Sequence, residues 1–450
     1  MTKLHKHITK DPSGFGMLPV FIVVGVLSLV GVAGYAVYQA SQEGNTSLSR
    51  TSGEGIAADC IRGASLNNDT GRLCLIGSDT PVVDGSLDLS TIDSLVGQLS
   101  QQELALINSI ETTRLGSDSR YLTAIEVSKQ RFQNRAPNNG VVLVNGESFI
   151  DASSAISMAY TRSLLYLPPD VTSENEIFVA VVNEIKRLGA DEVTIVGGSA
   201  AVTVAQEATI MDMLGSQVAA NKYKRLAGAS RIESAIEVAK GNTEAGNVVF
   251  VANGYKEADA VLFQGGYEEG PMVFINEDGS MHPATLEFLR SRQPKQIVML
   301  GGYSAVSGQT ETELLDEFTD SRIVRISGEN RYHTAVAVSR TIFQDDCDCA
   351  VYLINSDAQA DALMANTLSQ SAGRHGPVLY VDQSGVPNQT AEEIRRLRPS
   401  KIFVIGGTGR ISEATVSLAK ALAAGVIELD NSGNTREPTP PRGRPGDVSQ

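Results

Sequence analysis

The chain has 450 residues, which is room for about three domains of ordinary size. Its formal net charge of −15 repels the phosphate backbone of nucleic acids at long range, so nucleic acid is not an expected partner. Tryptophan is absent and aromatic residues make up 5% of the chain, which argues against an aromatic platform for stacking bases or sugar rings.

The first element in chain order is an expected membrane helix over residues 17–40. No charged side chain occurs between Pro12 and Gln42, and the apolar stretch exceeds the roughly 20 residues that a helix needs to cross a bilayer. Three lysines precede it and no basic residue follows until Arg50, which predicts a cytoplasmic segment 1–16 and an extracytoplasmic remainder. A cleaved signal peptide is the alternative, but the stretch is long for a signal core and lacks a clear cleavage site. We therefore expect an uncleaved signal anchor in a single-pass protein of the cell membrane.

Residues 41–111 are expected to form an extracytoplasmic spacer. The first part is rich in Ser, Gly and Thr, and the segment that ends near residue 110 has Leu and Ile at helical spacing. Cys60 and Cys74 bracket a polar loop. Because disulfides persist in exported proteins, we predict that these two cysteines are bonded.

Three copies of one pattern occupy most of the remaining chain. RLGSDSRYLTA, RLAGASRIESA and RISGENRYHTA surround Arg120, Arg231 and Arg331, and an apolar run ending in Asn follows each. An Asp-Ala pair begins six residues after that Asn, and each copy closes on an apolar run ending in Gly-Gly. The glycine pairs begin at 197, 301 and 406, so the period is that of a small domain.

Within each copy, short Val- and Ile-rich runs alternate with helical patterns, which is typical of a parallel sheet covered on both faces. The expected fold class is therefore α/β, with three tandem Rossmann-like units, each a doubly wound parallel sheet. The expected bounds are 112–216, 217–316 and 317–427. The tail 428–450 is rich in Pro and Arg, and we expect it to be disordered.

Arg120, Arg231 and Arg331 each precede an expected helix near strand ends, where open α/β sheets bind ligands. Such an arginine can grip a phosphate or a carboxylate with two hydrogen bonds. Alternatively, the three arginines pair with the repeated aspartates of the same or a neighbouring copy, because a partly buried charge needs a partner; this internal pairing is favoured. These aspartates are Asp151, Asp259 and Asp361.

Two further sets recur at the strand ends. Asn145, Asn253 and Asn355 end the first buried strand of each copy, where an Asn side chain contacts a ligand or caps the next turn; capping is favoured. The pairs that begin at Gly197, Gly301 and Gly406 are expected to end strands and open helices, either to present amides to an anion or to allow a tight turn; the turn is favoured.

Catalysis and metal binding find little support in the sequence. Three of the five histidines lie in the repeats and are isolated from one another, and no nucleophile elbow or zinc-protease motif occurs. Cys347 and Cys349 stand in DDCDC, which fits a metal site, a local disulfide or two surface thiols. The metal is disfavoured because no histidine or second cysteine pair is near. No cofactor or metal is expected.

The repeated motifs resemble the cell-wall-binding type 2 repeat of bacterial surface and wall-lytic proteins, which usually occurs in three tandem copies. The third copy is most similar, through RISGENRYHTA, ADALMA, GPVLYV and FVIGGT, and the second is similar through RLAGASR, ADAVL, GPMVFI and VMLGGYSAVS. The first copy departs from the pattern: Ser117 replaces the motif glycine, and Ser163 stands where the other copies have Pro271 and Pro377.

This resemblance implies non-catalytic attachment to a cell-wall glycopolymer, anionic in some members, through a pseudo-threefold arrangement of the Rossmann-like units. Together with the expected anchor, it predicts a membrane-held protein whose bulk faces the cell wall. A surface module that binds or assembles with other proteins is the alternative function, followed by an enzyme that acts on wall sugars.

Overall fold

The computed structural model describes residues 73–75, 99–429 and 435–436, except for 118, 137–138, 242–246, 263–269, 348 and 372–373. Across these ranges, no helix combines the length and apolar character that a membrane span requires. The expected membrane helix over 17–40 lies outside the described residues, as does Cys60 of the predicted Cys60–Cys74 bond. Both therefore stay predictions.

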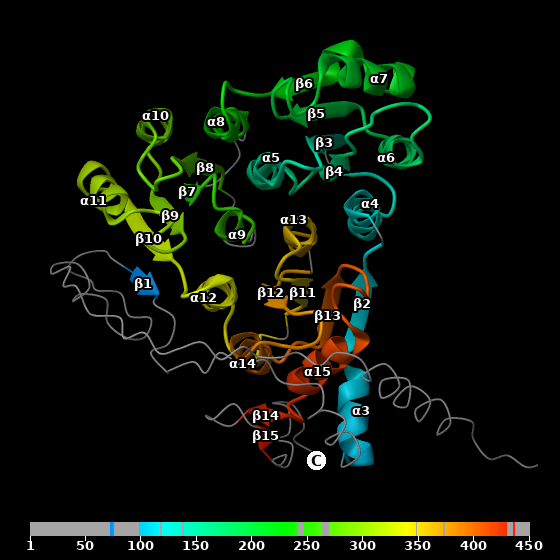
Figure 1. Ribbon diagram of the computed structural model, residues 1–450, viewed down its shortest axis with the longest axis vertical. Helices are drawn as coiled ribbons and strands as arrows, with labels where there is room; N and C mark the ends of the chain where they lie inside the picture. The colour runs from blue at the N-terminus through cyan, green and yellow to red at the C-terminus, as the bar shows by residue number, and fades with distance from the viewer. Residues whose placement is uncertain are drawn as a thin grey trace, which may run out of the picture.

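Three parallel sheets form the body of the protein, one for each copy of the sequence pattern (Figure 1). In each sheet the first strand of the copy lies between the second and the third, so the chain winds in both directions from the middle. The first sheet has the order β4-β3-β5-β6, formed by Ser163–Leu167, Gly140–Asn145, Glu192–Val196 and Tyr223–Leu226. The second is β8-β7-β9-β10, formed by Met272–Ile275, Val248–Asn253, Gln296–Leu300 and Arg322–Ile326, with β1 (Leu73–Leu75) added beside β10. The third is β12-β11-β13-β2, formed by Val378–Val381, Val351–Asn355, Lys401–Ile405 and Glu111–Leu115.

Helices connect the strands within each unit, as the alternating pattern predicts. The first unit has α4 (Arg120–Arg131), α5 (Phe149–Ala155), α6 (Glu176–Arg187) and α7 (Val204–Leu214), with the short 3-10 turns η2 (Ile156–Met158), η3 (Gly215–Gln217) and η4 (Ala220–Lys222). The second has α8 (Arg231–Gly241), α9 (Glu257–Ala260), α10 (Pro283–Arg292) and α11 (Gly308–Glu317). The third has α12 (Arg331–Ile342), α13 (Gln359–Ser369), α14 (Asn388–Leu397) and α15 (Glu413–Ala423). The expected class of three parallel-sheet α/β repeats is confirmed.

The fourth strand of each sheet comes from the next copy of the pattern, which the sequence analysis did not anticipate. β6 carries the RL of RLAGASR but pairs with β5 of the first sheet, and β10 likewise pairs with β9 of the second. The third sheet is completed by β2, from the start of the first copy, which pairs with β13 in parallel register. The three units are thus closed into a ring, in which the N-terminal strand joins the last sheet.

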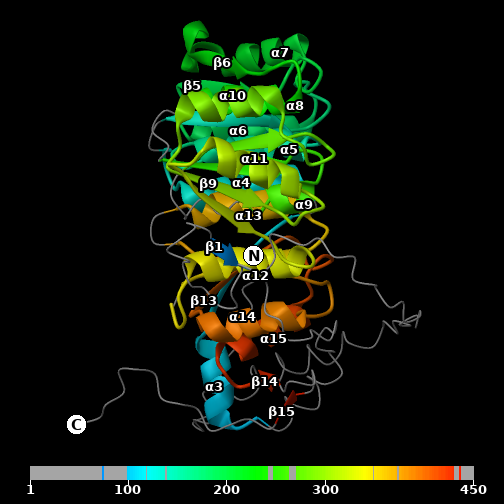
Figure 2. The ribbon, with the colours of Figure 1, turned by 90° about the vertical axis from the view of Figure 1, so that its left-hand side faces the viewer.

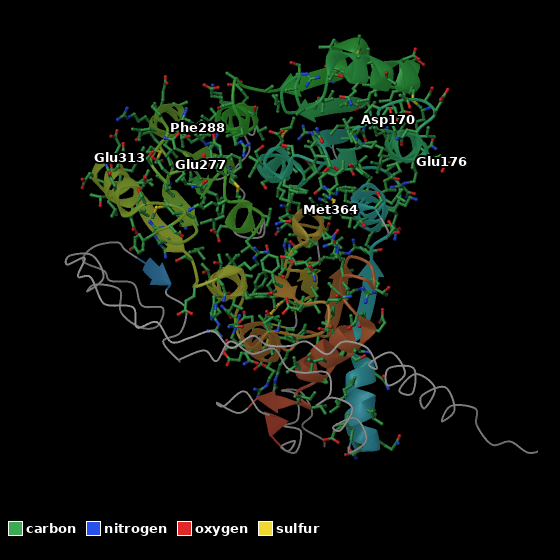
Figure 3. All side chains as sticks on the ribbon, viewed as in Figure 1. Asp170, Glu176, Glu277, Phe288, Glu313 and Met364 are labelled. Carbon is green, nitrogen blue, oxygen red and sulfur yellow. A yellow bond between two sulfur atoms is a disulfide. The ribbon has the colours of Figure 1, made fainter. Side chains whose placement is uncertain are left out.

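The units also pack against one another through helices that meet in the middle of the ring (Figure 1). Helices α5 and α13 contact each other, and α5 also contacts α8 and α9 of the second unit. Met364 of α13 is fully buried and lies in this central region (Figure 3). The exposed acidic residues Asp170 and Glu176 lie on the outside of the first unit (Figure 3). The core is therefore shared between units, as expected for small repeats that bury too little surface alone.

The segments outside the ring include one helix and a small hairpin. Helix α3 (Gln101–Ser109) precedes β2 and extends beyond the third unit in both views (Figures 1 and 2). Its start is fixed by a capping box between Ser100 and Glu103. Strands β14 (Glu428–Leu429) and β15 (Thr435–Arg436) pair antiparallel inside the tail for which no structure was expected.

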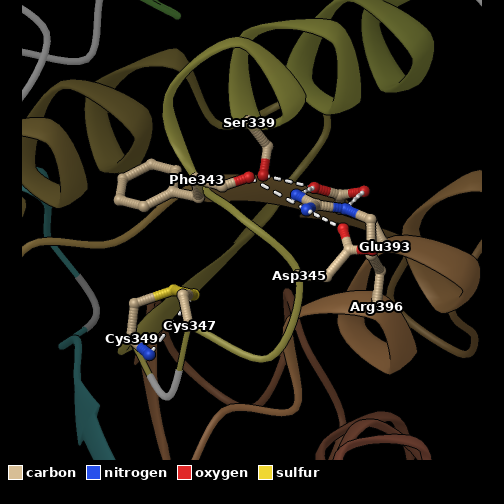
Figure 4. Close-up of a disulfide and its surroundings, with 7 residues drawn as sticks. All are labelled: Ser339, Phe343, Asp345, Cys347, Cys349, Glu393 and Arg396. Carbon is tan, nitrogen blue, oxygen red and sulfur yellow. Dashed lines mark hydrogen bonds and ion pairs between the residues drawn. A yellow bond between two sulfur atoms is a disulfide. The ribbon is translucent and has the colours of Figure 1, made fainter.

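Cys347 and Cys349 form a disulfide in the loop between α12 and β11 (Figure 4). Of the three interpretations that the sequence left open, the structure therefore has the local disulfide. No group of metal-ligating side chains occurs among the residues that the structure describes.

Candidate functional site

The structure contains two repeated sets of arginines at the carboxyl ends of the sheets. The first set is Arg114, Arg225 and Arg325, the opening residues of the three motifs, which sequence reasoning did not single out. Each donates from Nη1 to the oxygen of the first glycine of a Gly-Gly pair in the copy before it around the ring, which for Arg114 is the third copy, at 2.8 to 2.9 Å. Each also forms an ion pair with a glutamate of that same neighbouring copy: Arg114 with Glu413, Arg225 with Glu207 and Arg325 with Glu311.

In this first set, all three guanidinium nitrogens have protein partners. Arg225 and Arg325 place both Nε and Nη2 on the glutamate, and Arg114 uses Nε for Glu413 and Nη2 for the oxygen of Ile411. These arginines hold the exchanged strand against the neighbouring sheet. Their bonding leaves them no fork with which to grip a ligand.

The second set consists of Arg120, Arg231 and Arg331, which the sequence analysis did single out. Each is the first residue of its helix. The preceding Ser119, Ser230 or Asn330 accepts hydrogen bonds from backbone amides of the first turn, which fixes where the helix begins.

Only Nη1 of these guanidiniums is used in the hydrogen bonds found within the described ranges. It donates to the oxygens of Gly146, Gly254 and Ser356, the residues that follow the repeated asparagines. The Nε–Nη2 edge is the one that binds a carboxylate or phosphate with two parallel hydrogen bonds. The side chains of Arg120 and Arg331 are 35% and 34% exposed, so solvent reaches them.

The repeated aspartates face the arginine of the next copy around the ring. The charge of Arg231 acts on Asp151, that of Arg331 on Asp259, and that of Arg120 on Asp361. The ion pairs seen among the described residues are instead Arg120–Glu147 (3.5 Å) and Arg331–Asp357 (3.1 Å). The expected Arg–Asp clamp is therefore a longer-range attraction between neighbouring repeats rather than a bonded pair.

Burial raises the pKa of all three aspartates above the ordinary value. For Asp151, a hydrogen bond from Ser148 and the charge of Arg231 oppose the effect of burial on the pKa. For Asp361, the charges of Arg410 and Arg120 oppose it only partly, and the pKa rises to about 6. These carboxyl groups are thus held in a poorly solvated position at the edge of each junction.

The repeated asparagines act as structural links across the point where each sheet changes its winding direction. Nδ2 of Asn145, Asn253 and Asn355 donates to a backbone oxygen in the loop after the Gly-Gly pair, at 2.7, 2.9 and 3.0 Å. Each Oδ1 accepts from a backbone amide two residues later. The turn-capping interpretation is confirmed. In doubly wound folds this crevice usually holds the ligand, whereas here the chain's own side chains bridge it.

The glycine pairs end strands as predicted but do not open helices. Gly197, Gly301 and Gly406 have φ of 112°, 110° and 122°, a conformation that favours glycine. A Cβ on any of them would lie within 2.7 to 3.0 Å of Oδ2 of the aspartate of the same copy. In the first copy, helix α7 begins only at Val204, after a separate cap at Thr203. The expectation of a helix N-terminus at the glycines was wrong, and the turn interpretation holds.

Comparisons with known proteins agree with this repeated geometry. The profile of cell wall binding domain 2 (CWB2) matches residues 114–207, 225–311 and 325–416, more than half of the chain. The chain belongs to the CWB2 family. The three matches begin at Arg114, Arg225 and Arg325, the arginines that carry the strand exchange. Membership in the CWB2 family implies association with the cell wall at the surface.

Two curated relatives come from Bacillus subtilis. The chain is 27% identical to the N-acetylmuramoyl-L-alanine amidase LytC over 73% of its own length and 61% of that protein. It is 25% identical to the protein named amidase enhancer, over 69% of its own length and 41% of that protein. The chain thus spans less than two thirds of either relative.

Two solved structures, both from Clostridium difficile, share the fold. Cwp8 superposes with a TM-score of 0.59 at 25% identity, over 70% of this chain and 52% of that one. Cwp6 has a TM-score of 0.60 at 23% identity, over 70% of this chain and 48% of that one. The three-repeat arrangement of the CWB2 family is therefore present here.

Proposed function

We propose that the protein binds an anionic cell-wall glycopolymer at the three junctions of the CWB2 ring, without catalysing a reaction on it. The observation that supports this is the Nε–Nη2 edge of Arg120, Arg231 and Arg331, which has no hydrogen-bond partner among the described residues. A carboxylate or phosphate of the polymer fits this edge with two parallel hydrogen bonds. The edge recurs at three places, as suits a repeating polymer, because several weak contacts on one chain add avidity.

The two sets of arginines provide the main argument for placing the polymer at this edge. Arg225 sits in the same motif as Arg231, but each of its three guanidinium nitrogens donates to Glu207 or to the oxygen of Gly197. If Arg120, Arg231 and Arg331 had a purely structural role, we would expect their Nε and Nη2 atoms to have protein partners as well. We also propose, from the sequence, that residues 17–40 anchor the protein in the cell membrane with residues 1–16 in the cytoplasm, so that the ring faces the wall.

Sedimentation of the purified full chain with isolated cell walls tests the proposal. We expect the Arg231→Ala, Arg331→Ala double variant to remain folded and to lose most of its sedimentation with walls. The matched control is Arg135→Ala, Arg290→Ala, which removes the same charge from exposed surface positions. Failure of the unaltered chain to sediment at low salt would contradict wall binding. Equal sedimentation of both double variants would move the site away from the junction arginines.

Protease-stripped walls separate the proposed ligand from a protein partner. We expect binding to survive removal of wall proteins, since the polymer supplies the anions. Binding that disappears with the wall proteins would instead support the surface interaction module.

A further inference from the structure

Two arginines that follow no repeat meet at the junction between the first and the third units. Arg131 is the last residue of α4, and Arg374 lies in the loop between α13 and β12. The positions equivalent to Arg131, eleven residues after the motif arginine, are Asn242 and Ile342 in the other copies. This pair is therefore a feature of one junction and is absent from the repeated pattern.

Backbone oxygens and one hydroxyl hold the guanidinium of Arg131. Nη2 donates to the oxygen of Ala159 at 2.6 Å, Nη1 to that of Arg162 at 3.3 Å, and Nε to Oγ of Ser371 at 3.1 Å. Ser371 belongs to the third unit, so this arginine bridges the junction.

Arg374 crosses the same junction in the opposite direction. Its Nη1 donates to the oxygen of Gln130 at 2.5 Å, one residue before Arg131. Within the described ranges, its Nε and Nη2 have no hydrogen-bond partner. An arginine carries five N–H donors, so most of the donors of Arg374 remain for a ligand.

Among the described residues, no carboxylate pairs with the two positive charges of Arg131 and Arg374. Burial is the first cause that lowers the pKa of Arg131, the charge of Arg374 is the second, and together they bring it to about 9. The remaining group that acts on it is Tyr352, and no described Asp or Glu contributes. Arg162, which lends its backbone oxygen, pairs its own guanidinium with Glu192 at 3.4 Å.

The end of α4 compensates this charge only in part. A helix C-terminus carries about half a negative charge, against the two positive charges placed there. Like charges side by side in a partly buried position are unfavourable without a counterion. On a chain of net charge −15, such a concentration of positive charge needs a specific explanation.

We propose that Arg131 and Arg374 form a second anion site, which takes a phosphate or carboxylate group. The site lies at the amino ends of β4 and β12, on the opposite edge of the sheets from Arg120. It rests on the proposed function for its ligand, since an anionic wall polymer that spans both edges supplies the group. The forked donors of Arg374 bind the anion, and Arg131 positions that arginine and adds its charge.

Inorganic phosphate is the probe for the first test. The melting temperature of the full chain is measured against phosphate concentration at constant ionic strength, because a ligand that binds the native state raises it. We expect Arg374→Gln to raise the dissociation constant for phosphate by about tenfold or more, which is the usual effect of losing charged hydrogen bonds. Arg135→Gln, an exposed arginine of the same unit, is the control and should behave like the unaltered chain.

Three outcomes would overturn the site. The first is the absence of a phosphate-dependent rise in the unaltered chain, and the second is equal affinity in Arg374→Gln. The third is a lower melting temperature of Arg374→Gln with the phosphate response intact, which would mean that the pair only stabilises the contact between the first and third units. If Arg374→Gln does not fold, Arg374→Lys keeps the charge without the planar fork and should still weaken phosphate binding.

Wall sedimentation distinguishes this site from the proposed function. Walls freed of phosphodiesters by hydrofluoric acid, and walls with amidated carboxyl groups, show which polymer anion is bound. We expect Arg374→Gln to weaken binding only to walls that retain that anion. If the unaltered chain ignores walls but binds phosphate through Arg374, the proposed function fails and the anion site stands. If the unaltered chain and Arg374→Gln bind walls equally, the proposed function stands and the anion site fails.

Discussion

Arg114 donates from Nη1 to the backbone oxygen of Gly406 at 2.9 Å, which joins residues 292 positions apart in the chain. The same bond joins Arg225 to Gly197 and Arg325 to Gly301, but over short separations. The contact that closes the ring is thus a copy of the contacts that build it. Closure therefore requires no interface chemistry beyond what the repeat already supplies.

The first prediction concerns this closing contact. Arg114→Gln should lower the free energy of unfolding by about 1.5–3 kcal/mol, because buried carbonyl oxygens lose a charged donor. Lys401→Gln is the control on the same strand pair, since Glu111, its ion-pair partner, is 64% exposed and the pair should contribute at most about 1 kcal/mol. Urea denaturation measures both. Equal effects of the two variants would show that Arg114 does not hold the strand.

The second prediction compares the two glycines of one pair. In Gly301→Ala, the Cβ would lie 2.7 Å from Oδ2 of Asp259 at a φ of 110°. The variant should be destabilised by about 2–4 kcal/mol from backbone strain and the close contact. In Gly302→Ala, the Cβ has no atom within 4 Å, so its stability should change by no more than about 1 kcal/mol. Thermal melting of both variants measures the difference. Similar losses of stability in the two variants would show that any side chain in this loop is unfavourable, and that the conformation of Gly301 is not the cause.

Much of the fold could be predicted because the period of the motifs and the apolar runs are local features. Runs such as VVFVAN become fully buried strands, and the Asn that ends each run caps its turn as expected. The strand exchange could not be predicted, because the short strands that contain the opening RL or RI of each motif have no sequence feature that indicates which sheet they join. The pairing of Glu111–Leu115 with Lys401–Ile405 depends on closure of the whole ring.

The site was only partly predictable for the same reason. The sequence identifies Arg231 and Asp151 as repeated residues, but it leaves open whether an arginine faces the aspartate of its own copy or, as found, that of a neighbouring one. Arg225 and Arg231 look equally conspicuous in RLAGASR. Only the bonding of each guanidinium separates a structural arginine from one with an open edge. Arg131 and Arg374 are not part of the repeated motifs, so the repeat pattern could not identify them.

The third prediction follows from the raised pKa of Asp361. Burial lifts this pKa from 3.8 to about 6, so the native state holds the proton more firmly than the unfolded chain. The contribution of Asp361 to stability is therefore greatest below about pH 4 and is lost as the pH rises through 6. A shift of two pKa units corresponds to about 3 kcal/mol.

Asp361→Asn should accordingly raise the free energy of unfolding at pH 8 by up to about 3 kcal/mol and change it little at pH 4. The control is Asp357→Asn, whose side chain is 79% exposed, and which should have a small effect at both values. Denaturant titrations at the two pH values measure this. A loss of stability at pH 8 would mean that the carboxylate serves as a needed acceptor.

A polar trio around a buried glutamate occurs in the first and third units, and two of its three members are replaced by apolar residues in the second. Oγ of Ser339 donates to Oε1 of Glu393 at 2.5 Å, and Arg396 donates to both oxygens of that carboxylate (Figure 4). Ser128, Glu184 and Arg187 repeat the arrangement in the first unit. The equivalent positions in the second unit are Ala239, Phe288 and Ser291, and the first two are buried.

The fourth prediction uses this natural replacement. Arg396→Met should destabilise the protein by about 3 kcal/mol, because Glu393 has no exposed side-chain surface and would keep only the more exposed Arg340, which donates to its Oε2 at 3.1 Å, as a charged partner. Arg396 also donates to Asp345 and to the oxygen of Phe343, and these contacts are lost as well. The triple variant Ser339→Ala, Glu393→Phe, Arg396→Ser reproduces the second unit and should recover at least half of the loss, since no buried charge remains. Chemical denaturation of both variants tests this, and a triple variant less stable than Arg396→Met would show that the helix spacing in the third unit is fitted to the polar trio alone.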